Sequence, residues 1–265
     1  MGMNPLTLAV SKVNIGSSSS ATGFFYRSGD DIFFITNKHV VKDKNDNYYD
    51  LCIFQNYLMI DRRVKSGASL SIRSDIVQHI TFFHENDDVD IAVLWIIGNK
   101  GFVRNLSELT NDDQIRTICC LNDIGQTDIS AEVADNVFII GYPFGISAER
   151  GISHGSPKPI WKCGTIATEM SLNYDVNNLG SFLIDATGQQ GNSGSPVVAY
   201  AGSGSGMFKT SDGGITMLSG GGLIYKILGI MSAILIVPSS NEKSDLCVIW
   251  KKKLIDEIIK KIMNN

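Results

Sequence analysis

One serine of this chain lies in a turn whose composition suits acyl-transfer chemistry. Ser193 stands in the run Gly-Asn-Ser-Gly-Ser-Pro (191–196), just before a predicted apolar strand. Glycines let the backbone curl tightly, so successive N–H groups can point at the oxyanion that forms when a serine Oγ attacks a carbonyl carbon. Gly/Ser-rich turns are also common as plain surface loops. A nucleophilic serine therefore needs a base and an orienting acid elsewhere in the chain.

The candidates for the base are the four histidines of the chain, which are His39, His79, His84 and His154. His39 follows an apolar, aromatic-rich run at residues 31–36 and a short polar turn, which places its imidazole at the rim of a predicted barrel. A histidine at such a rim can simply donate to a backbone carbonyl. Beside a serine turn of this kind, His39 is the candidate general base.

The candidate acid lies in the acidic loop Asp-Asp-Val-Asp (87–90), which runs directly into the apolar segment 91–97. Asp90 is the last carboxylate before that segment. We expect it at the strand entrance, partly buried, where it can accept a hydrogen bond from one imidazole nitrogen and fix the tautomer. Asp87 and Asp88 are interpreted as solvated loop charges. His39, Asp90 and Ser193 thus form a candidate catalytic triad.

Three motifs in this order carry a resemblance to a known family. They are Thr-Asn-Lys-His-Val-Val (36–41), Asp-Ile-Ala-Val-Leu (90–94) and Gly-Asn-Ser-Gly-Ser-Pro (191–196). Further matching segments are residues 22–25, 139–145, 185–187 and 228–233. The sequence resembles the trypsin-like serine peptidases, with the bacterial HtrA-type branch most similar, over residues 20–236.

The resemblance implies an all-β fold of two six-stranded antiparallel, chymotrypsin-like β-barrels with a C-terminal α-helix. It implies that Ser193 is the nucleophile, that His39 is the general base and then the acid, and that Asp90 stabilises the imidazolium. The oxyanion hole would come from the backbone N–H groups of Gly191 and Ser193. Ser232 matches the serine that hydrogen-bonds the catalytic aspartate, and as a single residue it could equally be an ordinary strand serine. Neither a metal nor an organic cofactor is implied.

The resemblance also implies a substrate-binding surface made by Thr187, Ser232, Ala233 and Ile234. Thr187, six positions before the nucleophile, matches the base of the pocket for the side chain that precedes the scissile bond. Because no carboxylate stands there, cleavage after Lys or Arg is disfavoured. Ile234 matches a wall position where glycine leaves an open slot, so its branched side chain would shorten the pocket. We expect cleavage after small or medium apolar residues such as Ala, Val or Leu.

Two other serines need a separate interpretation. Ser195 stands where most of the family has a second glycine, and it would carry about 1 kcal/mol of strain if the backbone there needs a positive φ. Ser153 lies in a G-x-S-x-G match at residues 151–155, which is the nucleophile elbow of α/β-hydrolases. That fold needs its acid and histidine downstream, and no histidine lies beyond His154. We interpret residues 146–159 as a surface loop on the substrate side.

The period-two alternation of apolar residues predicts strands along most of the chain. In the N-terminal barrel, residues 1–100, the expected strands are 6–15, 22–27, 32–36, 49–56, 69–83 and 90–97. In the C-terminal barrel, residues 131–265, they are 132–140, 161–169, 182–186, 194–200, 223–235 and 246–249. Residues 101–130 are expected to link the barrels, with a short helix at 105–114. A cleft between the barrels would bring His39 and Asp90 to Ser193.

Two further segments depart from the strand pattern. Residues 250–263 have helical spacing with one apolar face, which we expect to pack on the second barrel. The Gly/Ser-rich insertion 201–222 is expected to be a disordered hairpin extension, with a mobile flap near the cleft as the alternative.

Composition agrees with a peptidase of this kind. The 265 residues suffice for a substantial core, and a net charge of −4 gives no polyanion-binding surface, so nucleic acid is not an expected partner. The five cysteines are odd in number and have no C-x-x-C spacing, which argues against a metal site or a disulfide framework. No leader-like N-terminus and no membrane-length apolar span is present, so we expect a cytoplasmic protein without a membrane partner. The sequence also ends without the peptide-capturing module that many HtrA-type proteins append.

The sequence therefore predicts a serine endopeptidase that works on protein or peptide substrates through an acyl-enzyme on Ser193. The main alternative is a peptide-binding module on the same fold, either inactive or dependent on an activating partner protein that arranges the oxyanion hole. An esterase would share the same machinery.

Overall fold

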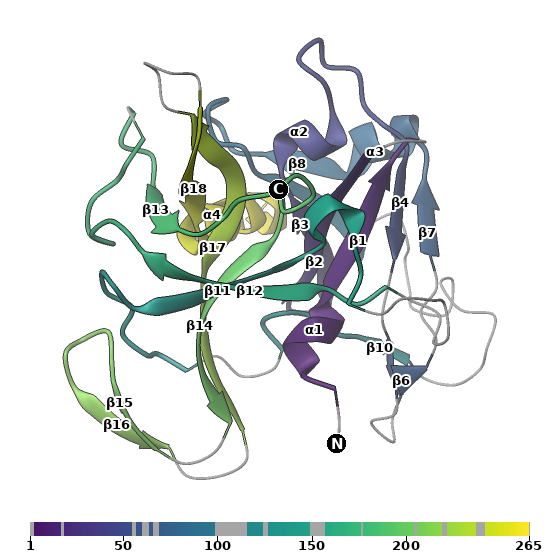
Figure 1. Cartoon of the computed structure of the whole chain (residues 1–265). Coiled ribbons are helices and arrows are strands. Elements are labelled where there is room, and N and C mark those ends of the chain that lie inside the picture. Colours follow the sequence, from purple (N-terminus) through teal and green to yellow (C-terminus); the bar gives the residue numbers. More distant parts are fainter. Residues whose placement is uncertain are drawn as a thin grey trace.

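The computed structural model of the chain places two strand-rich halves side by side (Figure 1). It describes residues 3–16, 19–54, 57–59, 64–65, 69–98, 116–123, 127–148, 157–175, 177–203, 206–218, 222–236 and 242–264. The helix predicted at 105–114 and the G-x-S-x-G match at 151–155 lie outside the described residues.

The N-terminal half is an open sheet of seven antiparallel strands in the order β7-β4-β1-β2-β3-β9-β8. These strands are β1 (Val10–Ile15), β2 (Ser19–Ser28), β3 (Asp31–Thr36), β4 (Leu51–Phe54), β7 (Ser69–Ile72), β8 (Thr81–Phe83) and β9 (Ala92–Ile97). A second sheet joins β5 (Tyr57–Met59), β6 (Val64–Lys65) and β10 (Arg116–Ile118). Because its edge strands β7 and β8 do not pair with each other, the predicted closed six-stranded barrel is wrong for this half.

Two short helices in this half also depart from the predicted strands. Residues 5–9 form α1 (Pro5–Ala9), where Asn4 caps the first turn and Pro5 begins the helix, so only the second part of the predicted strand 6–15 is extended. The predicted strand 69–83 is split by α3 (Ser74–Ile80), which buries Val77 and Ile80 at helical spacing. This helix carries the chain away from β7 before β8 begins, and the sheet therefore stays open.

The central strands of the open sheet bury both of their faces, which explains their nearly continuous apolar runs. Phe33 and Ile35 of β3 lie in a core cluster with α4 and the other half of the molecule. Phe34, between them, lies in a second cluster with residues of β4, β7 and α3, on the opposite face of the sheet. Alternating side chains point to opposite faces of a strand, so a strand with two buried faces loses the polar alternation of a surface strand.

The C-terminal half is a closed six-stranded barrel, as predicted, with the strands in the order β11-β12-β13-β18-β17-β14. Its strands are β11 (Asn136–Gly141), β12 (Ile160–Ile166), β13 (Ser181–Asp185), β14 (Pro196–Ser203), β17 (Leu223–Ile236) and β18 (Lys243–Lys251). The insertion after β14 forms a hairpin of β15 (Gly206–Lys209) and β16 (Ile215–Leu218), so disorder is the wrong prediction for residues 206–218. The hairpin lies at the far end of the barrel from α2 (Lys38–Val41) in Figure 1.

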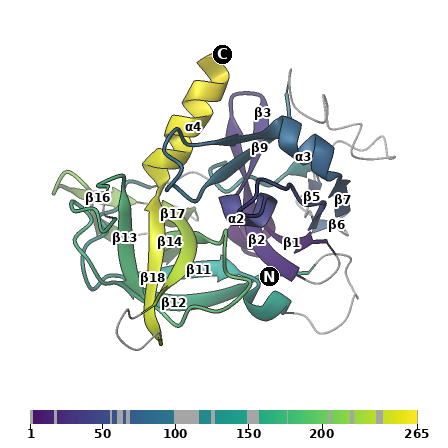
Figure 2. The same cartoon turned by 90° about the horizontal axis from the view of Figure 1, so that it is seen from above.

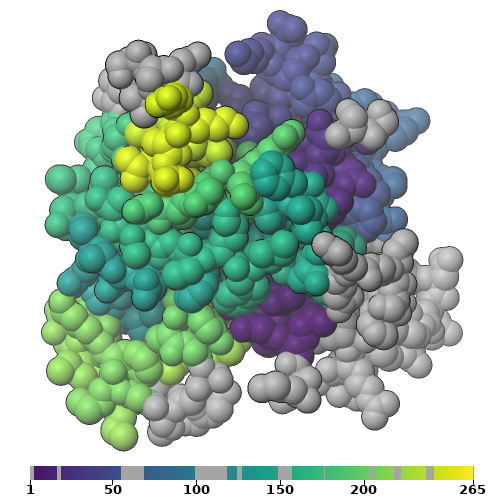
Figure 3. Space-filling view, in the orientation of Figure 1, coloured from purple at the N-terminus to yellow at the C-terminus, as the bar shows by residue number. Residues whose placement is uncertain are grey.

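The C-terminal helix α4 (Lys252–Asn264) is confirmed, and it packs against both halves rather than the barrel alone. Its buried residues Leu254, Ile255, Ile258, Ile259 and Ile262 join a cluster that includes Trp95 of β9 and Ile230 of β17. The view from above shows α4 extending from the end of β18, with the C-terminus at its tip (Figure 2). In the space-filling view the green and yellow C-terminal residues occupy one side of the molecule and the purple and blue N-terminal residues the other (Figure 3). None of the helices in the described part of the chain is both long and apolar enough to cross a membrane.

Candidate active site

His39 lies on α2, a single helical turn that follows β3, whereas the sequence indicated only a polar turn there. Val40 and Val41 are buried in the core of the N-terminal half and fix this turn against the sheet. The neighbouring Asn37 donates from Nδ2 to the backbone carbonyl of Asp90 at 2.7 Å. The side chain of His39 itself stays 52% exposed, so its imidazole is held from one side and accessible from the other.

The carboxylate of Asp90 contacts His39 through both of its oxygens. Its Oδ2 lies 2.8 Å from Nδ1 of His39, and its Oδ1 accepts a hydrogen bond from the His39 backbone N–H at 3.1 Å. The hydroxyl of Ser232 donates to the same Oδ2 at 2.5 Å. Because an ionised carboxylate can only accept hydrogen bonds, this geometry favours the tautomer of His39 with the proton on Nδ1. The lone pair of Nε2 is then free to accept a second proton.

The turn that carries Ser193 is anchored to both halves of the molecule. The backbone N–H of Thr22, on β2, donates to the carbonyl of Ser193 at 2.9 Å. On the barrel side, the N–H of Gly194 donates to the carbonyl of Met231 at 2.9 Å. Gly194 has a φ of 84°, a left-handed conformation in which a Cβ would clash with the Thr22 carbonyl, so glycine is required there.

The hydroxyl of Ser193 donates to the backbone carbonyl of Ser232 at 3.4 Å, a long hydrogen bond. In the described part of the chain it makes no hydrogen bond to His39, although both residues line one cavity of about 450 Å³. The structure thus joins His39 to Asp90 directly and places Ser193 beside them. Proton transfer to Nε2 of His39 requires the Ser193 hydroxyl to come within hydrogen-bond reach of that nitrogen.

The peptide between Gln190 and Gly191 has a defined orientation. The Gln190 carbonyl accepts a hydrogen bond from the N–H of Phe144 at 2.5 Å. Across a planar trans peptide the N–H points opposite to the C=O, so the Gly191 N–H points away from residues 143–145. Gly191 lines the same cavity as Ser193 and His39. Neither its N–H nor that of Ser193 has an acceptor among the described residues, so both donors are available to a ligand.

The other predicted substrate-binding residues lie on two segments of the C-terminal barrel, one before Ser193 and one in β17. A register shift in β17 between Met231 and Ala233 leaves Ser232 outside the ladder, which frees its hydroxyl for Asp90 and its carbonyl for Ser193. Two positions later, the side chain of Ile234 packs directly over Gly188, where a Cβ would clash with it. Thr187 and Ala233 are exposed at this edge of the barrel.

Lys162 is a residue of this region that the sequence reasoning missed. Its Nζ donates to the backbone carbonyl of Thr187. The sequence does place Lys162 in the predicted strand 161–169. The direction of its side chain, however, depends on the pairing of β12 with β11, which the sequence alone does not reveal.

Ser195 does not carry the strain that a positive φ would impose. The residues with positive φ in this turn are Gly191 and Gly194, and Ser195 is not among them. Its buried side chain occupies the space that Gly141 leaves by lacking a Cβ. Within the described structure the Ser195 hydroxyl has no hydrogen-bond partner.

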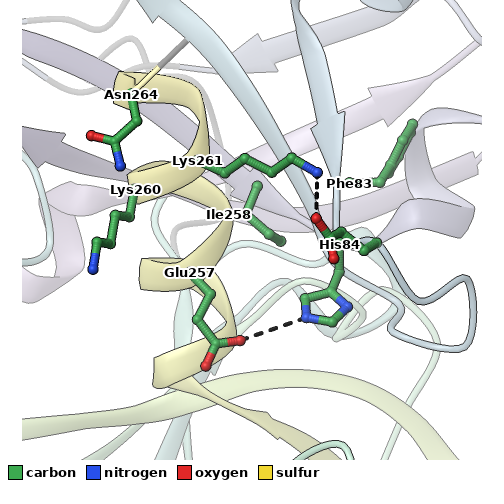
Figure 4. Close-up of a pocket in the computed structure, with 8 residues that line it drawn as sticks. Phe83, His84, Glu257, Ile258, Lys260, Lys261 and Asn264 are labelled. Atoms are coloured by element: carbon green, nitrogen blue, oxygen red, sulfur yellow. Dashed lines mark hydrogen bonds and ion pairs between the residues drawn. The ribbon is translucent and has the colours of Figure 1, made fainter.

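Two further cavities lie outside the Ser193 turn. One of about 620 Å³ lies on the other side of His39, between α2, the loop after it and Asp87. The other, of about 450 Å³, lies between α4 and the segment after β8 (Figure 4). There His84 contacts Glu257 at 3.5 Å and Lys261 contacts Glu85 at 2.6 Å. These two ion pairs connect α4 to the segment that leads to Asp90. No group of three metal-ligating side chains occurs in the described ranges.

The comparison with protein families agrees with the site. The sequence pattern of the trypsin-like peptidase domain matches residues 21–207, which is more than half of the chain. The chain belongs to the family of trypsin-like peptidase domains. Among proteins with curated descriptions, none matches it.

The two AlgW structures among the solved structures similar to this chain show the same fold at low sequence identity. Two structures of the HtrA-type protease AlgW with a tripeptide have TM-scores of 0.53 and 17% identity, covering 97% of this chain. This chain spans only 60% of the length of the AlgW chains. Deg5 has a TM-score of 0.49 and 15% identity, covering 96% of this chain and 87% of its own. A mutant of Rv3671c from M. tuberculosis H37Rv in its inactive form has a TM-score of 0.48 and 14% identity, covering 98% and 89%.

Proposed function

We propose that this protein is a serine endopeptidase that hydrolyses peptide bonds through an acyl-enzyme on Ser193. The observation that carries the proposal is the hydrogen bonding of Asp90 to His39 and Ser232, beside a glycine-flanked Ser193 that shares a cavity with His39. Membership of the trypsin-like peptidase family supports it. The likeness in fold to AlgW, an HtrA-type protease, also supports a peptidase.

In this mechanism Ser193 attacks the scissile carbonyl while Nε2 of His39 takes the hydroxyl proton. Asp90 holds the imidazole by Nδ1 and stabilises the imidazolium that forms. The N–H groups of Gly191 and Ser193 donate to the oxyanion. His39 then protonates the leaving amine, and a water activated by the same imidazole hydrolyses the acyl-enzyme. No metal or organic cofactor takes part in these steps.

A fluorophosphonate probe tests the proposal, because it reacts with a serine that is activated by a neighbouring base. We expect stoichiometric labelling at Ser193 and hydrolysis of a mixed peptide library. The change Ser193→Ala should remove the labelling and lower turnover by roughly 10⁴ to 10⁶-fold. Thermal unfolding of the variant should match that of the wild type. A folded wild-type protein that is neither labelled nor active on any peptide would exclude the enzyme.

A peptide-binding module is the second candidate, and one observation favours it. The Ser193 hydroxyl donates to the Ser232 carbonyl and not to His39. On this alternative the cleft binds peptides without cleaving them, or cleaves them only after an activating partner protein reorients the serine. Labelling that appears only when such a partner is added would favour the dependent form. An esterase would be labelled as well, but it would hydrolyse ester substrates and leave peptides intact.

The predicted preference for a small or medium apolar residue before the scissile bond has partial support. The packing of Ile234 over Gly188 supports a short pocket. The predicted preference for an apolar side chain assumes that the base of this pocket is uncharged, with Thr187 as the residue there.

A further inference from the structure

Lys162 projects into the end of the C-terminal barrel. It is paired with Ile139 across β11 and β12, and directly paired residues place their side chains on the same face of a sheet. Ile139 belongs to the core cluster of the barrel interior, as does Ile166, four residues beyond Lys162 on the same strand. The stem of Lys162 therefore follows the interior face, and its ammonium reaches the backbone carbonyl of Thr187 at the barrel rim.

No carboxylate in the described ranges pairs with Lys162. Other lysines of this half have an acidic partner, as Lys209 has Glu132 at 2.5 Å and Lys226 has Asp128 at 3.1 Å. Partial burial lowers the pKa of the Lys162 ammonium, while the nearby Cys247 raises it. A cation that is partly removed from water and satisfied only by a neutral carbonyl gains when an anion approaches it.

The carbonyl that holds this cation belongs to Thr187, six residues before Ser193 in the chain. The segment 187–193 runs beside residues 232–234, because Ile234 packs over Gly188 and the Ser193 hydroxyl contacts the Ser232 carbonyl. Both Ile234 and the Cys247 sulfur approach Gly188, and the Thr187 carbonyl with its lysine lies next to it along the chain. The resemblance to trypsin-like peptidases implies that the side chain just before the scissile bond lies against these two segments, with Thr187 at the base of its pocket.

We propose that Lys162 makes the protein select an acidic side chain, Asp or Glu, immediately before the scissile bond. The carboxylate replaces the Thr187 carbonyl as the partner of the ammonium. Because Ile234 packs over Gly188 and so restricts the space beside Thr187, the shorter Asp is accepted better than Glu. The inference rests on the proposed function, and it replaces the apolar preference with an acidic one.

The first test is a set of fluorogenic peptides that differ only in the residue before the scissile bond, with Asp, Asn, Glu, Gln, Ala and Lys at that position. The amides match the acids in size, so the ratio of kcat/KM for Asp over Asn isolates the charge. We expect a ratio of tenfold or more, with Lys the poorest substrate. A ratio within twofold of one, or Ala above Asp, would overturn the proposal.

The second test changes the lysine. Lys162→Gln should bring the ratio of Asp over Asn close to one while fluorophosphonate labelling of Ser193 stays at the wild-type rate. Lys162→Arg keeps the charge and should keep part of the preference, which guards against misreading a folding defect. Lys251→Gln is the matched control, because Lys251 is also partly buried and donates to the Leu172 carbonyl at 2.7 Å on the same barrel. An undiminished ratio in Lys162→Gln would contradict the assignment.

Binding separates this inference from the proposed function. The same peptides are titrated into the Ser193→Ala protein by fluorescence anisotropy, with and without Lys162→Gln. Acid-selective binding that requires Lys162 would support the inference even if the wild-type protein is never labelled at Ser193. In that case the proposed peptidase activity would be excluded, and the acidic preference of the pocket would still be supported. Equal binding of the Asp and Asn peptides would overturn the inference whether or not the protein is a peptidase.

Discussion

Ser232 lies 2.5 Å from Asp90 through its hydroxyl and 3.4 Å from the Ser193 hydroxyl through its carbonyl. One residue of β17 therefore touches both the proposed acid and the proposed nucleophile. This is possible because the register shift in β17 takes Ser232 out of the hydrogen-bonded ladder. The sequence allowed an ordinary strand serine here, and the bulge is what gives this one its two contacts.

Replacing Ser232 tests the first of these contacts. Ser232→Ala removes the hydroxyl from Oδ2 of Asp90, while both contacts of Asp90 with His39 remain. We expect kcat to fall by roughly tenfold, which corresponds to the loss of one charge-assisted hydrogen bond of about 1.5 kcal/mol. Steady-state kinetics measures the change. Ser244→Ala is the control, since it removes a hydroxyl that donates to the Leu235 carbonyl on the neighbouring strand and should leave kcat unchanged.

Replacing Asp90 tests the tautomer of His39. In Asp90→Asn the amide can donate to Nδ1, which would place the imidazole proton on Nε2 and prevent it from accepting from Ser193. We expect kcat to drop on the order of 10⁴-fold with little change in thermal stability. Asp87→Asn is the control: Asp87 lies in the same loop, pairs with Lys38 at 2.8 Å and is 95% exposed. Nearly full activity in Asp90→Asn would remove Asp90 from the mechanism.

Replacing Gly191 tests the orientation of the proposed oxyanion donor. Gly191 has a φ of 93°, and an added Cβ would clash with the Tyr142 carbonyl. Gly191→Ala must therefore move the peptide that the Phe144 N–H holds, and we expect kcat to fall by roughly 10² to 10³-fold. Gly213→Ala is a matched control, because Gly213 has a φ of 84° and nothing within 4 Å of its Cβ position in the distant hairpin. It should lose stability from the left-handed backbone and no activity.

The residues of the candidate site could be predicted from the sequence because each lies in a short segment with its own local pattern. The serine turn needs its local glycines, and the acid needs only a carboxylate at the start of β9. The helical turn of α2 was missed because four residues give no periodic signal. What joins the segments, such as the contact of Ser232 with both Asp90 and Ser193, depends on a bulge in β17 that has no marker in the sequence.

The fold was predictable in the C-terminal barrel and less so in the N-terminal half. The C-terminal barrel has the six strands that its apolar segments predict, and it closes through the pairing of β11 with β14. The N-terminal sheet stays open because α3 interrupts an apolar segment that reads as one strand. Lys162 was missed for a related reason: strand register decides which face a side chain takes, and a shift of one residue would have turned it outward.

A last prediction concerns stability at low pH and the loop before β13. Partial burial alone would raise the pKa of Asp175, but hydrogen bonds from the backbone N–H groups of Leu179, Gly180 and Ser181 and from the Ser181 hydroxyl outweigh it and hold the pKa at about 2. The ordinary value in an unfolded chain is about 4. A carboxyl with a lowered pKa stabilises the fold above its unfolded pKa, and this contribution is lost as the pH falls from about 4 toward about 2.

Asp175→Asn should therefore lower the free energy of unfolding at pH 7 by about 1 kcal/mol, less than the full shift would give because the group is partly exposed. The difference between wild type and variant should shrink as the pH falls below about 4, which urea unfolding at pH 7, 4 and 2.5 measures. Asp185→Asn, at an exposed carboxylate on β13, controls for the loss of one charge. A difference that stays constant down to pH 2.5 would show that the Asp175 carboxylate does not hold this loop by its charge.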